Sequence, residues 1–368
     1  MAYTTIDDPS EHFTITLYTG TGANQDVVNS AHSGDFKPDL LVIKNRGNGS
    51  YGPHWYDSSR GVKKYLYSDQ NYGDDEETNN ANGSGSVQLF NTNGFRGGSS
   101  TNIYEILWTN GLNNTYVAWQ WKVAGGTTAS NSDGDITSTT QVNTTAGLSI
   151  ITYTGSGTTD DTIGHGLGVE PDIAIFKRRD VAAGNWDVQH NAGNPGAVTV
   201  AYRHTLNLTE GTATNVLSSF SSSTLGLSTG GDAQKNVSGS KYVCYAFKAI
   251  PGYSAFGSYY GNGTTNGEFV YLGFKPAFVM VKVLSDPNYG WVIADNKRGP
   301  FNENDPSVYA NSTAAETTND FNGDFLSNGF KLRGSTYPAN SGGTNTFAYF
   351  AWAENPFVTS TGIPTTAR

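Results

Sequence analysis

The segment Phe36-Lys37-Pro38-Asp39-Leu40-Leu41-Val42-Ile43-Lys44 places an apolar run, rich in branched residues, between a proline and a lysine. Proline has no N–H to donate to a β-ladder and fixes its own φ, so it suits the first residue of a strand. The run after Pro38 therefore predicts a buried strand. Lys44 is expected where the chain returns to water.

This pattern occurs three times in the chain, each time with the proline six residues before the lysine. The other two copies are Val169-Glu170-Pro171-Asp172-Ile173-Ala174-Ile175-Phe176-Lys177 and Phe274-Lys275-Pro276-Ala277-Phe278-Val279-Met280-Val281-Lys282. A strand pattern that ends in a glycine-containing turn precedes each copy. These earlier strands are Phe13–Tyr18, Leu148–Tyr153 and Phe256–Tyr259. The three copies predict a tandem repeat that covers about residues 12–123, 147–249 and 253–355.

Two further elements recur after each buried run. Asn93-Gly94 and Asn328-Gly329 lie between apolar residues, which is typical of a type I′ hairpin, whereas copy two has Ser222-Ser223-Thr224 there. A closing strand then carries aromatic residues at its first, fourth and sixth positions. Its three copies are Tyr116–Lys122, Tyr242–Lys248 and Phe347–Ala353. The closing strand is apolar on both faces, as expected of a central strand in a sandwich.

The composition favours short strands and turns over helices. Gly accounts for 45 of the 368 residues, aromatic residues for 12% and charged residues for only 15%. We therefore expect an all-β fold of three tandem β-sandwich, jelly-roll-like repeat domains. Their expected bounds are 1–123 with an N-terminal lead-in, a polar linker at 124–146, then 147–252, and 253–368 with an extended C-terminal tail.

The charge, the N-terminal pattern and the length of the apolar runs argue against a nucleic-acid-binding, secreted or membrane-spanning protein. A formal net charge of −10 opposes binding to nucleic acid or to anionic membranes. The N-terminus lacks the pattern of a signal peptide, and no run approaches the ~18 apolar residues of a membrane span. Cys244 is the only cysteine and lies in an apolar run, which predicts a buried, inert thiol.

No catalytic constellation stands out. The six histidines are scattered without metal-ligand spacing, and no Gly-x-Ser-x-Gly nucleophile elbow is present. The acidic run Asp74–Glu77 is interpreted as a solvated loop. Asp133-Gly134-Asp135, with Asn131, has the oxygen density of a Ca²⁺ turn, but EF-hand spacing is absent and a linker is the simpler interpretation. We expect a protein that is not an enzyme and holds no cofactor or metal, with Ca²⁺ near Asp133 and Asp135 left open.

The candidate recognition residues belong to a motif shared by copies one and three. Asp57 and Arg60, and likewise Asp295 and Arg298, form Asp-x-x-Arg-Gly, whose spacing suits either a structural ion pair across a tight turn or a ligand-binding pair. Loop aromatic residues are the other candidates, for glycan stacking or for packing at the rim of a sandwich. They are Tyr51, Trp55, Tyr65, Tyr67, Tyr72, Trp108, Tyr289 and Trp291. Copy two has Trp186 but no arginine, so recognition is expected on copies one and three.

Several stretches resemble the tail-fibre or virion structural proteins of marine tailed phages, the cyanophages and pelagiphages. The matching stretches are residues 3–10, 273–279, 295–302, 324–332 and 353–357. The resemblance covers nearly the whole chain and is strongest in copy three. It implies a place in the virion, on the tail or the capsid exterior, without implying an activity or a set of site residues.

This resemblance and the repeat together predict a structural protein of the tail apparatus, a fibre, spike or tip that presents a rigid row of modules for host attachment. Its expected partners are other virion proteins and a host surface glycan or receptor. A homotrimer is expected because fibres and spikes are commonly threefold, although three copies in one chain also allow a pseudo-threefold monomer. The alternatives are a capsid decoration protein, a glycan depolymerase and a carbohydrate-binding module.

Overall fold

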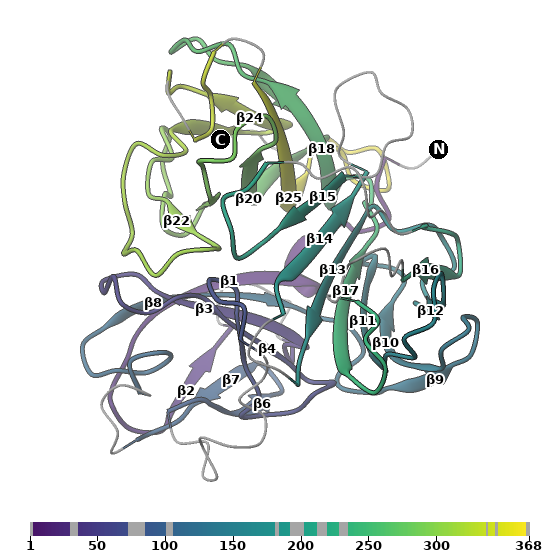
Figure 1. The fold of residues 1–368 in the computed structure, drawn as a ribbon. Coiled ribbons are helices and arrows are strands. Elements are labelled where there is room, and N and C mark those ends of the chain that lie inside the picture. Colours follow the sequence, from purple (N-terminus) through teal and green to yellow (C-terminus); the bar gives the residue numbers. More distant parts are fainter. Residues whose placement is uncertain are drawn as a thin grey trace.

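The computed structural model describes residues 3–29, 36–72, 85–100, 106–180, 184–191, 202–211, 219–227, 235–335, 338–342 and 345–365. This part of the chain is all-β, with one short 3₁₀ helix, η1 (Pro9–Glu11), before the first strand (Figure 1). We call the three repeats units one, two and three.

The strands fall into the three units as follows. Unit one contains β1 (Phe13–Thr19), β2 (Gln25–Val28), β3 (Leu40–Asn45), β4 (His54–Asp57), β5 (Leu66–Tyr67), β6 (Val87–Asn91), β7 (Gly94–Gly97) and β8 (Thr115–Trp121). Unit two contains β9 (Ala129–Asn131), β10 (Ser138–Asn143), β11 (Leu148–Thr154), β12 (Thr162–Gly164), β13 (Ile173–Arg178), β14 (Trp186–His190), β15 (Tyr202–Thr205), β16 (Thr224–Gly226) and β17 (Lys241–Phe247). Unit three contains β18 (Ser254–Tyr260), β19 (Phe269–Tyr271), β20 (Phe274–Val283), β21 (Trp291–Asp295), β22 (Val308–Tyr309), β23 (Gly323–Leu326), β24 (Gly329–Leu332) and β25 (Thr346–Pro356).

The large sheets of the three units share one topology. The five strands that they have in common run in the orders β1-β8-β3-β4-β5, β11-β17-β13-β14-β15 and β18-β25-β20-β21-β22. In unit two, β10 and β9 extend the sheet beyond β11. In every unit the closing strand lies between the first strand and the strand of the repeated Pro-to-Lys segment, and all of these pairings are antiparallel. A smaller sheet accompanies each large one, namely β2-β7-β6, β12-β16 and β19-β24-β23. The sequence repeat is thus a repeat of topology.

The central strands of each large sheet are buried on both faces because the two faces belong to different cores. In unit one, Leu41 and Ile43 point toward the small sheet and pack in a core with Phe95. Their neighbours Leu40 and Val42 point the other way, into a core that all three units share. The prediction that the closing strand is apolar on both faces is confirmed, and the shared core is the reason.

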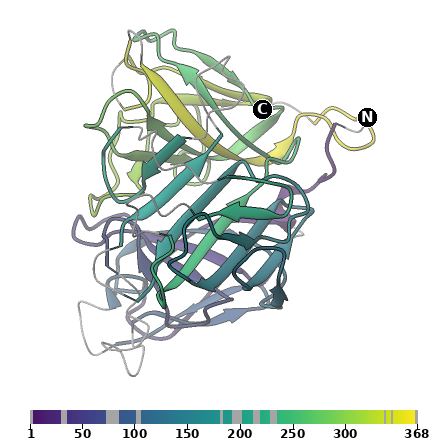
Figure 2. The same ribbon diagram turned by 45° about the vertical axis from the view of Figure 1, so that its right-hand side comes forward.

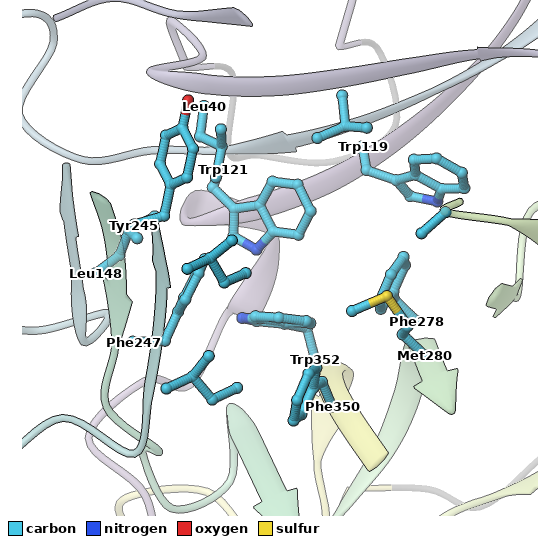
Figure 3. Packing of buried hydrophobic residues seen from close by; sticks show 14 of the residues in the cluster. Leu40, Trp119, Trp121, Leu148, Tyr245, Phe247, Phe278, Met280, Phe350 and Trp352 are labelled. Atoms are coloured by element: carbon cyan, nitrogen blue, oxygen red, sulfur yellow. The ribbon is translucent and has the colours of Figure 1, made fainter. Parts of the chain in front are cut away.

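The shared core brings together the sixth positions of the three closing strands, Trp121, Phe247 and Trp352 (Figure 3). The ring centroid of Trp352 lies 5.3 Å from that of Trp121 and 5.4 Å from that of Phe247. The three units therefore surround a common centre, as the two views of the ribbon also show (Figure 1, Figure 2). This arrangement corrects the expectation of a row of modules.

Two local predictions need correction. The hairpins at Asn93-Gly94 and Asn328-Gly329 exist, but each glycine begins the returning strand instead of occupying the turn. A Cβ on Gly94 would lie 2.1 Å from the carbonyl oxygen of Val27, so close approach of the neighbouring strand requires this glycine. The third proline, Pro276, lies within β20 at a register shift, whereas Pro38 and Pro171 precede their strands as predicted.

The segment 124–146, which we expected to be a linker, contributes β9 and β10 to the sheet of unit two. The carboxylate of Asp133 accepts a hydrogen bond from the Asn131 side chain, and that of Asp135 accepts two from Thr162. The C-terminal tail turns back on the lead-in, where the backbone N–H of Ser360 donates to Asp7.

Candidate functional site

The two Asp-x-x-Arg-Gly motifs form ion pairs inside the molecule. Arg60 Nε lies 2.5 Å from Asp57 Oδ2, and Arg298 Nε lies 2.6 Å from Asp295 Oδ2, with all four side chains fully buried. Each aspartate also accepts the backbone N–H of its arginine across the turn. Gly61 follows with a φ of +97°. The structural interpretation of these pairs fits, and the surface-recognition interpretation does not.

Each buried aspartate also binds the unit beside it. Tyr245 of unit two donates its hydroxyl to Asp57 Oδ2 of unit one at 2.8 Å. Trp119 of unit one donates its indole N–H to Asp295 Oδ2 of unit three at 3.1 Å. Tyr245 and Trp119 occupy the same position of their closing strands, so the two contacts are equivalent by the repeat.

The third interface lacks both halves of this contact. Strand register places His190 of unit two where units one and three have aspartate. Its neighbour from unit three is Phe350, which occupies the position of Tyr245 and Trp119 but has no donor. The ring centroids of His190 and Phe350 are 5.5 Å apart. Unit two therefore lacks the aspartate of the Asp-x-x-Arg-Gly motif at the interface where unit three also lacks a side-chain donor at the matching position.

The lysine that ends each repeated run is fully buried, which corrects the expectation that it meets water. Lys44, Lys177 and Lys282 each donate to a backbone carbonyl oxygen of a neighbouring unit. The acceptors are Thr313 at 2.8 Å, Asn71 at 3.4 Å and Thr209 at 2.8 Å, respectively. Burial lowers the pKa of Lys44 and of Lys282 to about 8. These contacts run in one direction around the centre: unit one binds three, three binds two, and two binds one.

The candidate tryptophans are also interior residues, and the two are not equivalent. Trp291 pairs with Lys282 in its sheet, whereas Trp55 pairs with Val42, two positions along. Trp291 donates to the carbonyl oxygen of Thr205 in unit two at 3.2 Å. Trp55 packs on Trp186, with ring centroids 5.2 Å apart.

Most of the other loop aromatic residues pack at the rim of unit one or three. Tyr65 is buried, Tyr51, Tyr67, Trp108 and Tyr289 are half-buried, and only Tyr72 is exposed. Trp108 stacks on the buried ring of His54 at 5.3 Å. Burial lowers the pKa of His54 to about 3. These residues form no open aromatic platform.

The remaining sequence candidates are Cys244 and the acidic run Asp74–Glu77. Cys244 is buried, as predicted, and burial raises the pKa of its thiol well above the usual range. Asp74–Glu77 lies outside the described residues. No group of three or more His, Cys, Asp or Glu side chains in the described ranges is placed to hold a metal ion. Within the same ranges, no helix has the length and apolar character needed to cross a bilayer.

An open polar cavity of about 380 Å³ lies in unit three, and the sequence reasoning missed it. Its walls include Lys275, Asn296, Lys297, Phe301, Asn302 and Glu354. A smaller cavity of about 30 Å³ shares Asn296, Lys297 and Glu354 and continues toward β1 of unit one. The cavity therefore adjoins the seam between the end of unit three and the beginning of unit one.

The polar groups of this cavity differ in how well they are satisfied. The ammonium group of Lys275 pairs with Glu354 at 2.6 Å. The amide of Asn302 is held by two hydrogen bonds to the backbone of Phe325. The side-chain oxygen of Asn296 is buried without a hydrogen-bond partner. A ligand hydroxyl that reached Asn296 would remove the cost of this unpaired acceptor.

The family described as domain of unknown function (DUF7483) matches residues 8–356, nearly the whole chain, so the chain belongs to this family. None of the curated proteins and none of the solved structures matches it.

Proposed function

We propose that this member of the DUF7483 family is a structural protein of a phage virion, part of the tail apparatus, and presents its three β-sandwich units for host attachment. The observation that carries the proposal is the closed arrangement of the units around one core. The resemblance to virion proteins of marine tailed phages supports the same role.

The buried contacts between units favour a mechanical role over catalysis. Asp57, Asp295 and the lysines at positions 44, 177 and 282 are the polar residues that the repeat makes most prominent. All of them are buried and bind a neighbouring unit. Side chains committed in this way stabilise a rigid body and leave no general acid, base or nucleophile exposed among them.

The arrangement also bears on the expected homotrimer. Three similar units around one centre give a single chain an approximate threefold shape, so one chain can match a threefold position of a virion without two further copies. We therefore propose a monomer in place of the homotrimer. Light scattering should give about the chain mass of 39.3 kDa, and three times that mass would restore the homotrimer.

Mass spectrometry of gradient-purified virions, followed by antibody labelling of intact particles, tests the proposal. We expect the protein in the virions, with the label on the tail. Label over the capsid would favour the decoration protein instead. If purified virions lack the protein, the proposal is wrong, and a cellular carbohydrate-binding module becomes the leading alternative.

A further inference from the structure

In unit one, the segment that follows β8 covers the position that corresponds to the cavity of unit three. The carboxylate of Asp39 accepts the backbone N–H groups of Val123 and Gly125, at 2.7 and 2.8 Å. Lys37 donates to the carbonyl oxygen of Gly125 at 2.8 Å. The chain that leaves β8 is thus held over this position, and Gln141 covers it further by bonding Ser58.

Unit two repeats the device. Asp172, the equivalent of Asp39, accepts the backbone N–H of Ala249 at 2.7 Å, just after β17. The ammonium group of Lys248 lies 3.2 Å from the same carboxylate. In both units an aspartate after the repeated proline ties down the connection to the next unit.

Unit three has lost this device, and the position is open. Ala277 occupies the place that Asp39 and Asp172 have in the other units. The closing strand of unit three, β25, is also longer and continues to Pro356. Asn296, the equivalent of Ser58, donates its backbone N–H to the Ala277 carbonyl just as Ser58 does to that of Asp39. Lys275 and Asn296 line the large cavity, and Ala277 lines the smaller cavity beside it. The two cavities together therefore adjoin the position that the chain itself covers in the other two units.

The groups left free in this cavity are suited to a sugar and not to another stretch of backbone. The aspartate that accepted peptide N–H groups is absent, and Lys275, the equivalent of Lys37, is already paired with Glu354. Lys297 lines the cavity, and its ammonium group makes no hydrogen bond or ion pair with the described residues. The ring of Phe301, which also lines it, is 82% exposed.

We propose that this cavity binds one sugar residue that bears a carboxylate, as a uronic acid does; the proposal rests on the proposed role in host attachment. Lys297 would pair with the carboxylate. The side chain of Asn296, whose oxygen is buried in this structure, would turn toward the cavity to accept a sugar hydroxyl. The C–H face of the sugar would stack on Phe301. A volume of about 380 Å³ lies within the range usual for small-molecule sites.

Calorimetric titration of the purified full chain with short oligouronates tests this assignment. The panel contains oligomers of glucuronate, galacturonate and mannuronate, each beside its methyl ester, which keeps the shape but removes the charge. We expect at least one acid to bind at least tenfold more tightly than its ester. Lys297→Met should weaken acid binding at least tenfold and change ester binding little, whereas Phe301→Ala should weaken both.

Tyr271→Ala is the matched control, because Tyr271 is another exposed aromatic residue of unit three that does not line the cavity. This variant should bind as the unchanged protein does. Absence of binding across the whole panel, or binding that Lys297→Met and Phe301→Ala leave unchanged, would overturn the assignment. Such a result leaves the virion role intact when the protein is present in purified virions, so the two proposals fail separately.

Discussion

The indole N–H of Trp119 in unit one donates to the carboxylate of Asp295 in unit three at 3.1 Å, across the shared core. Asp295 also holds Arg298 within its own unit, and the guanidinium carbon of Arg298 lies 5.8 Å from the Trp119 ring centroid. One aspartate thus joins a local turn to the neighbouring unit. The equivalent contact from Tyr245 to Asp57 joins units two and one.

Removing the donor at this contact should destabilise the protein. Trp119→Phe keeps an aromatic ring but removes the N–H that donates to Asp295. Among the described residues, the buried Asp295 Oδ2 then keeps only its bond from Arg298. We expect the free energy of unfolding to fall by about 2–4 kcal/mol, from the lost hydrogen bond and the smaller ring. Urea denaturation measures this change. Tyr271→Phe, at an exposed position, should change it by less than about 0.5 kcal/mol.

The third interface allows a double-mutant cycle. His190→Asp alone places an unpaired carboxylate against Phe350, and Phe350→Tyr alone places a hydroxyl without its acceptor there. Each single variant should be destabilised, and the double variant should recover about 1–3 kcal/mol of the summed loss because donor and acceptor meet. Additive losses would show that the loss of the motif in unit two is unrelated to its neighbour.

The buried lysines predict a rise in stability on the alkaline side. In the folded protein Lys44 and Lys282 have a pKa of about 8, below the ordinary lysine value of 10.5. Between these values the unfolded chain binds more protons, so stability increases with pH. We expect about 1–2 kcal/mol per lysine between pH 8 and 9.5, and no contribution to the slope below pH 7. Lys44→Met should remove its part of the rise, which denaturation at several pH values measures.

His54 predicts a loss of stability in acid. Its pKa of about 3 in the folded protein lies below the ordinary histidine value of 6.5 because its ring is buried. The unfolded chain binds more protons in this interval, so stability is complete above pH 6.5 and falls as the pH drops toward 3. Unfolding at pH 4.5 should cost about 2 kcal/mol less than at pH 7 from this residue alone. His54→Gln should show a smaller decrease over the same interval.

The sequence was sufficient for the repeat, the order of its elements along the chain and the all-β class. Periodicity and the position of proline report on single strands, and each unit reuses the same strands in the same order. The closing strand even signalled its burial on two faces. A strand pattern does not show which residues cover its second face. That face belongs to the shared core, where Trp121, Phe247 and Trp352 meet only when all three units are assembled.

The misplaced lysines and the missed cavity have the same origin. A lysine at the end of an apolar run normally marks the surface, but Lys44 reaches the Thr313 carbonyl of a unit about 270 residues away. The cavity had a signal, since proline is followed by Asp39 and Asp172 in two copies and by Ala277 in the third. This difference points to a cavity only once the fold is known, because the fold shows that both aspartates accept backbone N–H groups of the segment after the closing strand.

The most direct test of the claim that the three units share one core is native-state hydrogen exchange of the full chain at increasing denaturant. The exchange is followed in β8, β17 and β25. Because these closing strands share one core, we predict that their most protected amides become exchangeable through one common opening, with the same free energy and the same dependence on denaturant. Opening of one closing strand at a lower denaturant concentration, while the other two stay protected, would contradict the account.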